Sequence, residues 1–322
     1  MHILESFKQE GLVALIALIL AISFSLNLDS YASWGNAIAL MRSMAILGVF
    51  ALGMIIVIIG RGIDLSQIAI GMVSAAISVK LQAAGLSLPL ALLVGLSTAM
   101  AMGSINAALI HWLAIPPLFA TLTSVFVFVG LARVSILPSM IINLPSQQTG
   151  LVALGQNWHS VPIPVMVFGA CALLTHLFLH ATTMGRFIYA YGDNAETARL
   201  SGLPLTAIVI SQYVLCAMLG FVAGLLMVST TAMVDLKTVN STMIFDVILV
   251  VVIGGGSLAG ARGGVSSVLA GLLLIGVLLN GMTLMDVNAQ LQNIIKGGVL
   301  LSVIMVDHWL HPYDEEDARQ SV

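Results

Sequence analysis

The chain has 322 residues, of which 59% are hydrophobic and 8% are charged. Soluble domains carry about a quarter charged residues, so this composition excludes a water-soluble globular protein and predicts an integral membrane protein. Basic residues number 11 against 14 acidic ones, and this balance argues against a nucleic-acid-binding surface.

Apolar runs recur along the whole chain. About twenty apolar residues cross a bilayer as an α-helix. Residues 11–26 lack a small-residue cleavage pattern after them, which favours a first span over a signal peptide. We therefore predict an all-α membrane protein, a single domain over 1–322, with about ten transmembrane helices. The candidate segments are 11–27, 38–60, 64–84, 88–112, 118–137, 162–181, 206–232, 246–259, 264–285 and 291–310.

Two of these segments are unusual. Segment 64–84 contains several polar residues, among them Ser74 and Ser78, which predicts a face turned toward protein or water. Segment 246–259 is short and glycine-rich, which predicts a half-helix or re-entrant element whose backbone other helices must cover. Its turn is either a gate or a passive packing turn, and it consists of Gly254, Gly255, Gly256 and Ser257.

The placement of lysine and arginine bears on orientation. With the N-terminus inside, the inner side holds six of the 11 basic residues and the outer side five, a weak bias. This orientation predicts that both termini and the loop 182–205 face the cytoplasm. The acidic tail 312–322 is then a solvated cytoplasmic end.

Motifs for catalysis and metal binding are missing from the sequence. It contains no Walker-type phosphate loop, no H-E-x-x-H, no C-x-x-C and no G-x-S-x-G. His176 and His180 are four residues apart but have no third ligand nearby, which predicts interfacial histidines. Cys171 and Cys216 lie in apolar runs and are expected to be buried. We therefore expect no catalytic residue, metal or cofactor in this chain.

The loop 182–205 is the least hydrophobic stretch between two spans. Asp193 or Asn194 can cap a short helix from Ala195 to Leu200. Gly202 stands where a C-terminal cap belongs. These signals predict a stiff helix outside the bilayer, which is either a surface element or a docking site for a cytoplasmic partner.

Three ordered motifs resemble those of the ribose-type sugar permeases of ABC importers, which are inner-membrane components of binding-protein-dependent transport systems. Residues 185–202, GRFIYAYGDNAETARLSG, resemble the family's coupling-helix pattern G-R-x-[IV]-Y-A-x-G-x-N-x-x-A-A-R-L-S-G. Residues 62–66, GIDLS, resemble G-G-I-D-L-S. Residues 253–263, IGGGSLAGARG, resemble [VI]-[IL]-G-G-x-S-L-x-G-G-R-G. The resemblance covers nearly the whole chain.

Some positions depart from the family pattern. Arg61 stands where the family usually has a glycine, and Gln67 follows Ser66 where a small apolar residue is common. Ile244 replaces a family glutamate, whereas Asp246 is kept. These departures bear on the ligand more than on the architecture.

The resemblance implies a permease subunit in a bacterial inner membrane that translocates a pentose, a hexose or a furanose-like sugar. It implies a second permease chain, identical or paralogous, and cytoplasmic ATP-binding subunits that hold ATP and Mg²⁺. It also implies a periplasmic or extracellular sugar-binding protein. The alternatives are an ABC permease for branched-chain amino acids, an autonomous secondary carrier and a membrane scaffold.

The resemblance also implies roles for individual residues. The residues expected to couple the permease to the ATPase are Asn194, Glu196, Ala198, Arg199, Leu200, Ser201 and Gly202. The polar residues expected along the translocation path are Asp64, Ser66, Asn106 and Asn280. For each of these four, the alternative is a hydrogen bond between helices.

Overall fold

The structure is a computed structural model and describes residues 2–135, 141–144 and 149–310. The predicted acidic tail lies outside the described residues. The helices are α1 (His2–Asn27), α2 (Trp34–Ile59), α3 (Gln67–Ala83), α4 (Leu88–His111), α5 (Pro117–Ser135), α6 (Thr149–Leu154), α7 (Ile163–Ala181), α8 (Thr183–Asp193), α9 (Ala195–Leu200), α10 (Leu205–Thr231), α11 (Met243–Ile253), α12 (Val265–Leu284) and α13 (Ala289–Leu310).

Each of the ten predicted segments coincides with one of these helices. Within the described residues, seven helical segments are long and apolar enough to cross a membrane. The remaining three predicted segments correspond to α3, α11 and α13. The prediction of an all-α, multi-pass membrane protein is confirmed. The seven segments are Gln9–Asn27, Trp34–Ile59, Leu88–His111, Pro117–Ser135, Ile163–Ala181, Leu205–Thr231 and Val265–Leu284.

The short glycine-ended segment forms a half-helix, as predicted. With 11 residues, α11 is about 16 Å long, roughly half of the hydrocarbon thickness of about 30 Å. Its side chains from Val247 to Ile253 are buried, and it packs on α2, α12 and α13. The helix ends at Ile253 and not at residue 259, because Gly255 takes a left-handed conformation with φ +107°.

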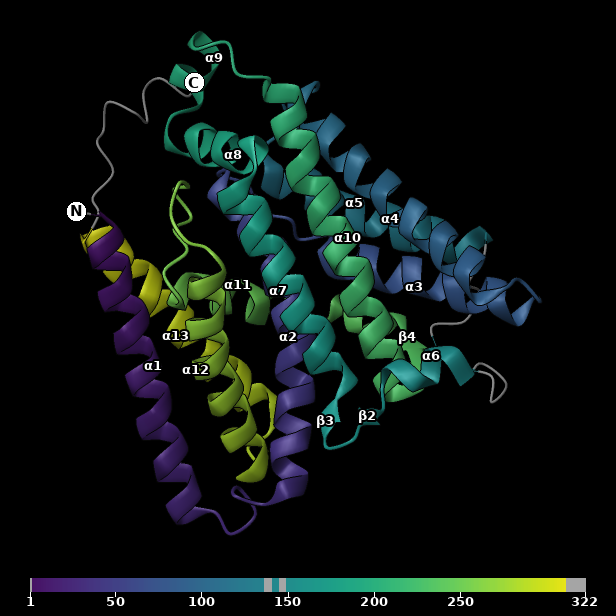
Figure 1. The fold of residues 1–322 in the computed structure, drawn as a ribbon, viewed down its shortest axis with the longest axis vertical. Helices are drawn as coiled ribbons and strands as arrows, with labels where there is room; N and C mark the ends of the chain where they lie inside the picture. The colour runs from purple at the N-terminus through teal and green to yellow at the C-terminus, as the bar shows by residue number, and fades with distance from the viewer. Residues whose placement is uncertain (1, 136–140, 145–148, 311–322) are drawn as a thin grey trace.

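The centre of the molecule is formed by α2 and α3, with α10 packed against both (Figure 1). Gln67 to Val79 of α3 are buried, so the polar face predicted for segment 64–84 is turned toward protein. Small residues allow the close packing of α3 on α10. A Cβ on Gly71 or Gly224 would strike the backbone of the opposite helix.

Two short strand pairings were not predicted. Strand β1 (Ile141–Asn143) pairs with β4 (Met233–Asp235), and β2 (Asn157–Trp158) pairs with β3 (Val161–Pro162), both antiparallel. The 3-10 helix η1 (Leu236–Asn240) follows β4. Strands β2, β3 and β4 lie away from α8 and α9, toward the other end of the molecule (Figure 1), and β1 pairs with β4 there.

Candidate functional site

The predicted short helix is present as α9 and begins and ends at the predicted residues. Asn194 is its N-cap, and its Oδ1 accepts a hydrogen bond from the Thr197 backbone N–H at 2.7 Å. Gly202 follows the helix with φ +74°, and its N–H donates to the Arg199 carbonyl at 3.0 Å. Both ends of α9 are therefore capped, which restricts fraying.

The outer surface of α9 combines an ion pair with an apolar side chain. Glu196 and Arg199 are paired at 2.7 Å, with their side chains 51% and 66% exposed. An exposed pair of this kind adds little stability. Leu200 is 78% exposed, whereas Ala198 is buried. Because α9 lies at the tip of the molecule (Figure 1), this surface is available to another protein.

The sequence analysis missed α8, the helix that carries α9. Thr182 is its N-cap, and Thr182 Oγ1 accepts from the Gly185 N–H at 3.0 Å. A threonine directly after an apolar span was the signal that could have located this start. The Tyr189 hydroxyl donates to the Gly263 carbonyl at 2.8 Å. Burial raises the pKa of Tyr189 to about 12, so the hydroxyl remains a donor at neutral pH.

Two sequence motifs, 185–202 and 253–263, meet at the end of α8 together with the residues that precede the third motif, and we call this contact the motif junction. It consists of Ile59 at the end of α2, Arg61, Gly192 of α8, and Gly260 and Ala261 of the glycine-rich turn. The Ala261 N–H donates to the Ile59 carbonyl at 2.8 Å. A Cβ on Gly192 would strike this same carbonyl, and a Cβ on Gly260 would lie 2.6 Å from the Gly192 carbonyl. Only glycine permits these backbones to approach so closely.

Arg61 forms the polar link of the motif junction. Its Nε donates to the Gly192 carbonyl at 2.7 Å and its Nη2 to the Asp193 carbonyl at 2.6 Å. These are terminal carbonyls of α8, which have no partner within their own helix. Arg61 also has φ +62°, a conformation that costs a residue with a side chain about 1–3 kcal/mol. Charge-assisted hydrogen bonds of about 1.5–3 kcal/mol each, weaker at this exposed position, offset that cost.

Three of the four residues predicted for the path form one buried cluster. Asp64 Oδ1 accepts from the Ser66 backbone N–H at 2.9 Å and from Ser66 Oγ at 2.6 Å. Asn106 Nδ2, on α4, donates to Ser66 Oγ at 2.7 Å. All three residues have no exposed surface. The structure thus brings together residues that are 40 positions apart.

The fourth residue, Asn280, lies elsewhere. Its side-chain amide exchanges two hydrogen bonds with that of Asn36, at 2.8 and 3.0 Å. Asn36 is near the start of α2 and Asp64 follows the end of α2, which separates the two sites by about 35 Å along the helix. Asn280 therefore joins α12 to α2 by a hydrogen bond between helices.

The predicted gate residues form an ordered turn. Gly254 caps α11, and the Gly256 N–H donates to the Val251 carbonyl at 2.9 Å. Ser257 Oγ accepts from Arg262 Nη2 at 3.3 Å. The turn leads directly into the motif junction through Gly260 and Ala261.

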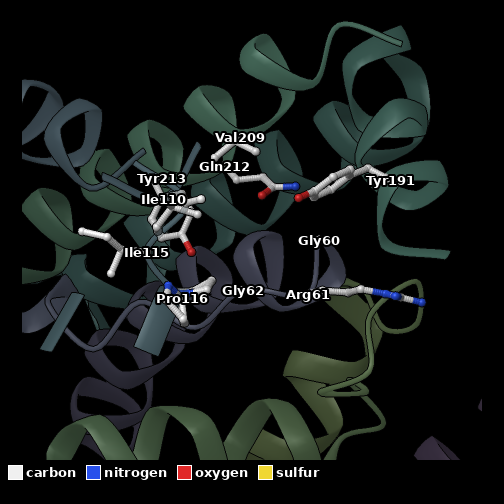
Figure 2. Close-up of a pocket in the computed structure, with 12 residues that line it drawn as sticks. Gly60, Arg61, Gly62, Ile110, Ile115, Pro116, Tyr191, Val209, Gln212 and Tyr213 are labelled. Carbon is white, nitrogen blue, oxygen red and sulfur yellow. The ribbon is translucent and has the colours of Figure 1, made fainter. Parts of the chain in front are cut away.

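A cavity of about 250 Å³ lies beside the motif junction (Figure 2). It is lined by the end of α2, the link between α4 and α5, and parts of α8 and α10. Gln212 Nε2 and Tyr213 Oη are buried in its wall and have no hydrogen-bond partner among the described residues. A cavity of this size has room for several water molecules, which could satisfy both groups.

Comparison with known proteins covers almost the whole chain. The family model described as "Branched-chain amino acid transport system / permease component" matches residues 36–304. The ribose import permease protein RbsC of Bacillus subtilis (strain 168) is 33% identical over 290 residues, which are 90% of this chain and 89% of that protein. Its namesake in Escherichia coli (strain K12) is 29% identical over 304 residues, or 94% of each chain. The galactofuranose transporter permease protein YtfT of the same strain is 31% identical over 273 residues, or 85% of this chain and 80% of that protein. No solved structure is significantly similar.

Proposed function

This chain belongs to the family of branched-chain amino acid transport system permease components, and from that premise we propose that it is the permease subunit of an ABC importer for a carbohydrate. ATP hydrolysis takes place in a partner subunit. The observation that carries the proposal is the similarity to a ribose import permease over about nine tenths of both chains. The family description names amino acids, but the relatives above import ribose and galactofuranose, which favours a sugar.

We assign the coupling role to residues 194–202, within the loop 182–205. The movement of an ATPase must be transmitted to the membrane helices, so the element that connects them must be rigid. The caps at Asn194 and Gly202 supply this stiffness. The exposed Leu200 and the ion pair of Glu196 and Arg199 offer a partner one apolar contact and two charges. Ala198 faces inward and Ser201 ends the helix, so these two residues position the exposed surface of α9.

For the translocation path we retain Asp64, Ser66 and Asn106. A carboxyl group buried between membrane helices is costly, and such groups commonly mark functional sites. All three are closed off in this conformation, so contact with a sugar requires the surrounding helices to separate. The turn formed by Gly254, Gly255, Gly256 and Ser257 is proposed as the element that moves, because it is continuous with the motif junction.

The proposed assembly contains a second permease chain, cytoplasmic ATP-binding subunits with ATP and Mg²⁺, and an external sugar-binding protein. The face that carries α9 is then cytoplasmic, together with both termini. Within the single permease domain, α8 and α9 are the cytoplasmic projection.

The coupling role is tested by Leu200→Glu, which places a charge where we expect an apolar contact. We expect the variant to insert normally but to lose copurification of the ATP-binding subunits and stimulation of ATP hydrolysis. Arg186→Glu, on the exposed face of α8, is the matched control and is expected to retain both. Undiminished stimulation in Leu200→Glu would reject the assignment of α9.

The energy source and the substrate class are tested by reconstitution. Proteoliposomes with the full importer and its binding protein are expected to accumulate ribose or another sugar only with ATP, and not leucine. Proteoliposomes with this chain alone are expected to show no uptake driven by an ion gradient. Gradient-driven uptake would establish a secondary carrier, and ATP-driven leucine uptake would establish an amino acid permease.

A further inference from the structure

We propose that Arg61 is a positioning residue that transmits the movement of α9 to the buried cluster of Asp64, Ser66 and Asn106. This inference rests on the coupling role proposed for α9. It goes beyond that role because it names the contact through which the motion leaves α9 and the segment of the permease that receives it.

The first step is the contact between Arg61 and the end of α8. The guanidinium holds the carbonyls of Gly192 and Asp193 at 2.7 and 2.6 Å. Asp193 directly precedes Asn194, the N-cap of α9. No flexible residue therefore separates the coupling helix from the arginine. Any displacement of the start of α9 acts on the two hydrogen bonds of Arg61.

The second step is the short path from Arg61 to the cluster. Asp64 is three residues further along the chain. Thr121 of α5 contacts this segment: its Oγ1 accepts from the Leu65 N–H at 3.1 Å, and its single hydroxyl hydrogen is shared between the Pro117 carbonyl at 2.9 Å and the Ile63 carbonyl at 3.2 Å. Because Ile63 and Leu65, which flank Asp64, both contact this one hydroxyl, we expect the segment to move as one unit when Arg61 is displaced.

The end of α2 has different surroundings on its two sides. Toward the glycine-rich turn, the Ile59 carbonyl accepts a hydrogen bond from the Ala261 N–H, which links the end of α2 to that turn. Toward α10, the backbone of Gly60 and Gly62 lines the cavity of about 250 Å³ (Figure 2). The Arg61 side chain extends away from the other cavity residues in the same view. The end of α2 is thus tethered on the α8 side, and it is close to α10, because a Cβ on Gly60 or Gly62 would strike Gln212 or Tyr213.

The backbone of Arg61 supports a role for its side chain. At φ +62° a glycine would be less strained. A residue that breaks a local conformational preference needs a compensating gain, and the two hydrogen bonds provide it. A lysine has one ammonium group and cannot reproduce the planar fork of donors that meets two adjacent carbonyls.

The test is hydrogen–deuterium exchange on the full importer complex in nanodiscs, with and without a non-hydrolysable ATP analogue and Mg²⁺. In the wild type we expect the analogue to change exchange at both 192–202 and 62–66. In Arg61→Gly, which relieves the backbone, we expect the response at 62–66 to fall about tenfold, the size of a typical coupling. The response at 192–202 should persist. Arg61→Lys should restore part of the response.

Controls separate this inference from its premise. Arg186→Ala removes an arginine of α8 and is expected to behave as wild type. Arg61→Asn also tolerates a left-handed backbone and replaces Arg61→Gly if that variant does not assemble. The inference is overturned if the change in exchange at 62–66 is as large in both variants as in the wild type. It is also overturned if, in the wild type, the analogue changes exchange at 192–202 but not at 62–66. A silent 192–202 in the wild type rejects the coupling helix itself.

Discussion

Ser66 is the hub of the buried cluster, because its hydroxyl donates to Asp64 and accepts from Asn106. The sequence could single out these three residues as polar groups in or beside apolar spans. It could not show that one serine joins the other two, since Asn106 is on another helix.

We expect Ser66→Ala to destabilise the protein by about 1–3 kcal/mol, because it leaves the buried Asn106 amide without its acceptor. The loss would appear as a lower melting temperature in detergent. Ser78→Ala is the matched control: Ser78 is equally buried, but its hydroxyl only donates to the Ser74 carbonyl of its own helix. Equal effects of the two substitutions would show that the cluster contributes no stability.

At the scale of the elements, a buried ion pair joins α11 to α13. Lys296 Nζ lies 2.8 Å from Asp246 Oδ1 and 3.1 Å from Oδ2, and both side chains are nearly covered. The sequence analysis noted that Asp246 is kept in the family pattern, but the pairing with a residue 50 positions away came only from the structure. A half-helix does not span the bilayer, so contacts with other helices must hold it in place. The ion pair is one such contact, near the start of α11.

We expect Lys296→Met to destabilise the protein by about 3–5 kcal/mol, because the Asp246 carboxylate is left buried and unpaired. Replacing both residues, with Asp246→Leu and Lys296→Met, should recover most of the loss. Thermal unfolding in detergent measures both. Lys237→Met, at an exposed lysine, is the control, and a single variant no worse than this control would contradict the expectation.

The helices α8 and α9 show where local signals suffice. The residues that cap α9 lie next to its two ends in the sequence, so the limits of the helix were predicted correctly. In α8, apolar and polar residues alternate. This helix follows the apolar helix α7 with only Thr182 between them, so its start was missed. Its burial depends on contacts with α2 and α10, which no local signal reports.

At the scale of the whole molecule, the ends of the membrane-spanning helices form two faces. One face carries α9, the motif junction and the start of α12, where Glu10 accepts hydrogen bonds from Ser266 and Ser267 at 2.9 Å. The other face carries the link between α1 and α2 and the strands. The lysine and arginine count was too even to show which face is cytoplasmic, and the contacts of Glu10 place the start of the first span on the same face as the start of α12.

This orientation is tested with single cysteines in a background where Cys171 and Cys216 are replaced by alanine. A charged, membrane-impermeant maleimide is expected to label Asp29→Cys in right-side-out vesicles and Ser201→Cys only in inverted vesicles. Both positions are exposed on loops or helix ends. The reverse pattern would place α9 outside the cell and remove the basis for its coupling role.

Composition and hydropathy by themselves determined that this is a membrane protein and that ten segments are helical, and the capping residues Asn194 and Gly202 determined that α9 is a capped helix. These properties depend on neighbouring residues and on the cost of placing polar groups in lipid. Only the tertiary structure decided which polar groups meet: Asn280 with Asn36, Asp64 with Asn106 through Ser66, and Arg61 with the end of α8. Those partners are 40 to 244 residues apart, and packing, not local preference, brings them together.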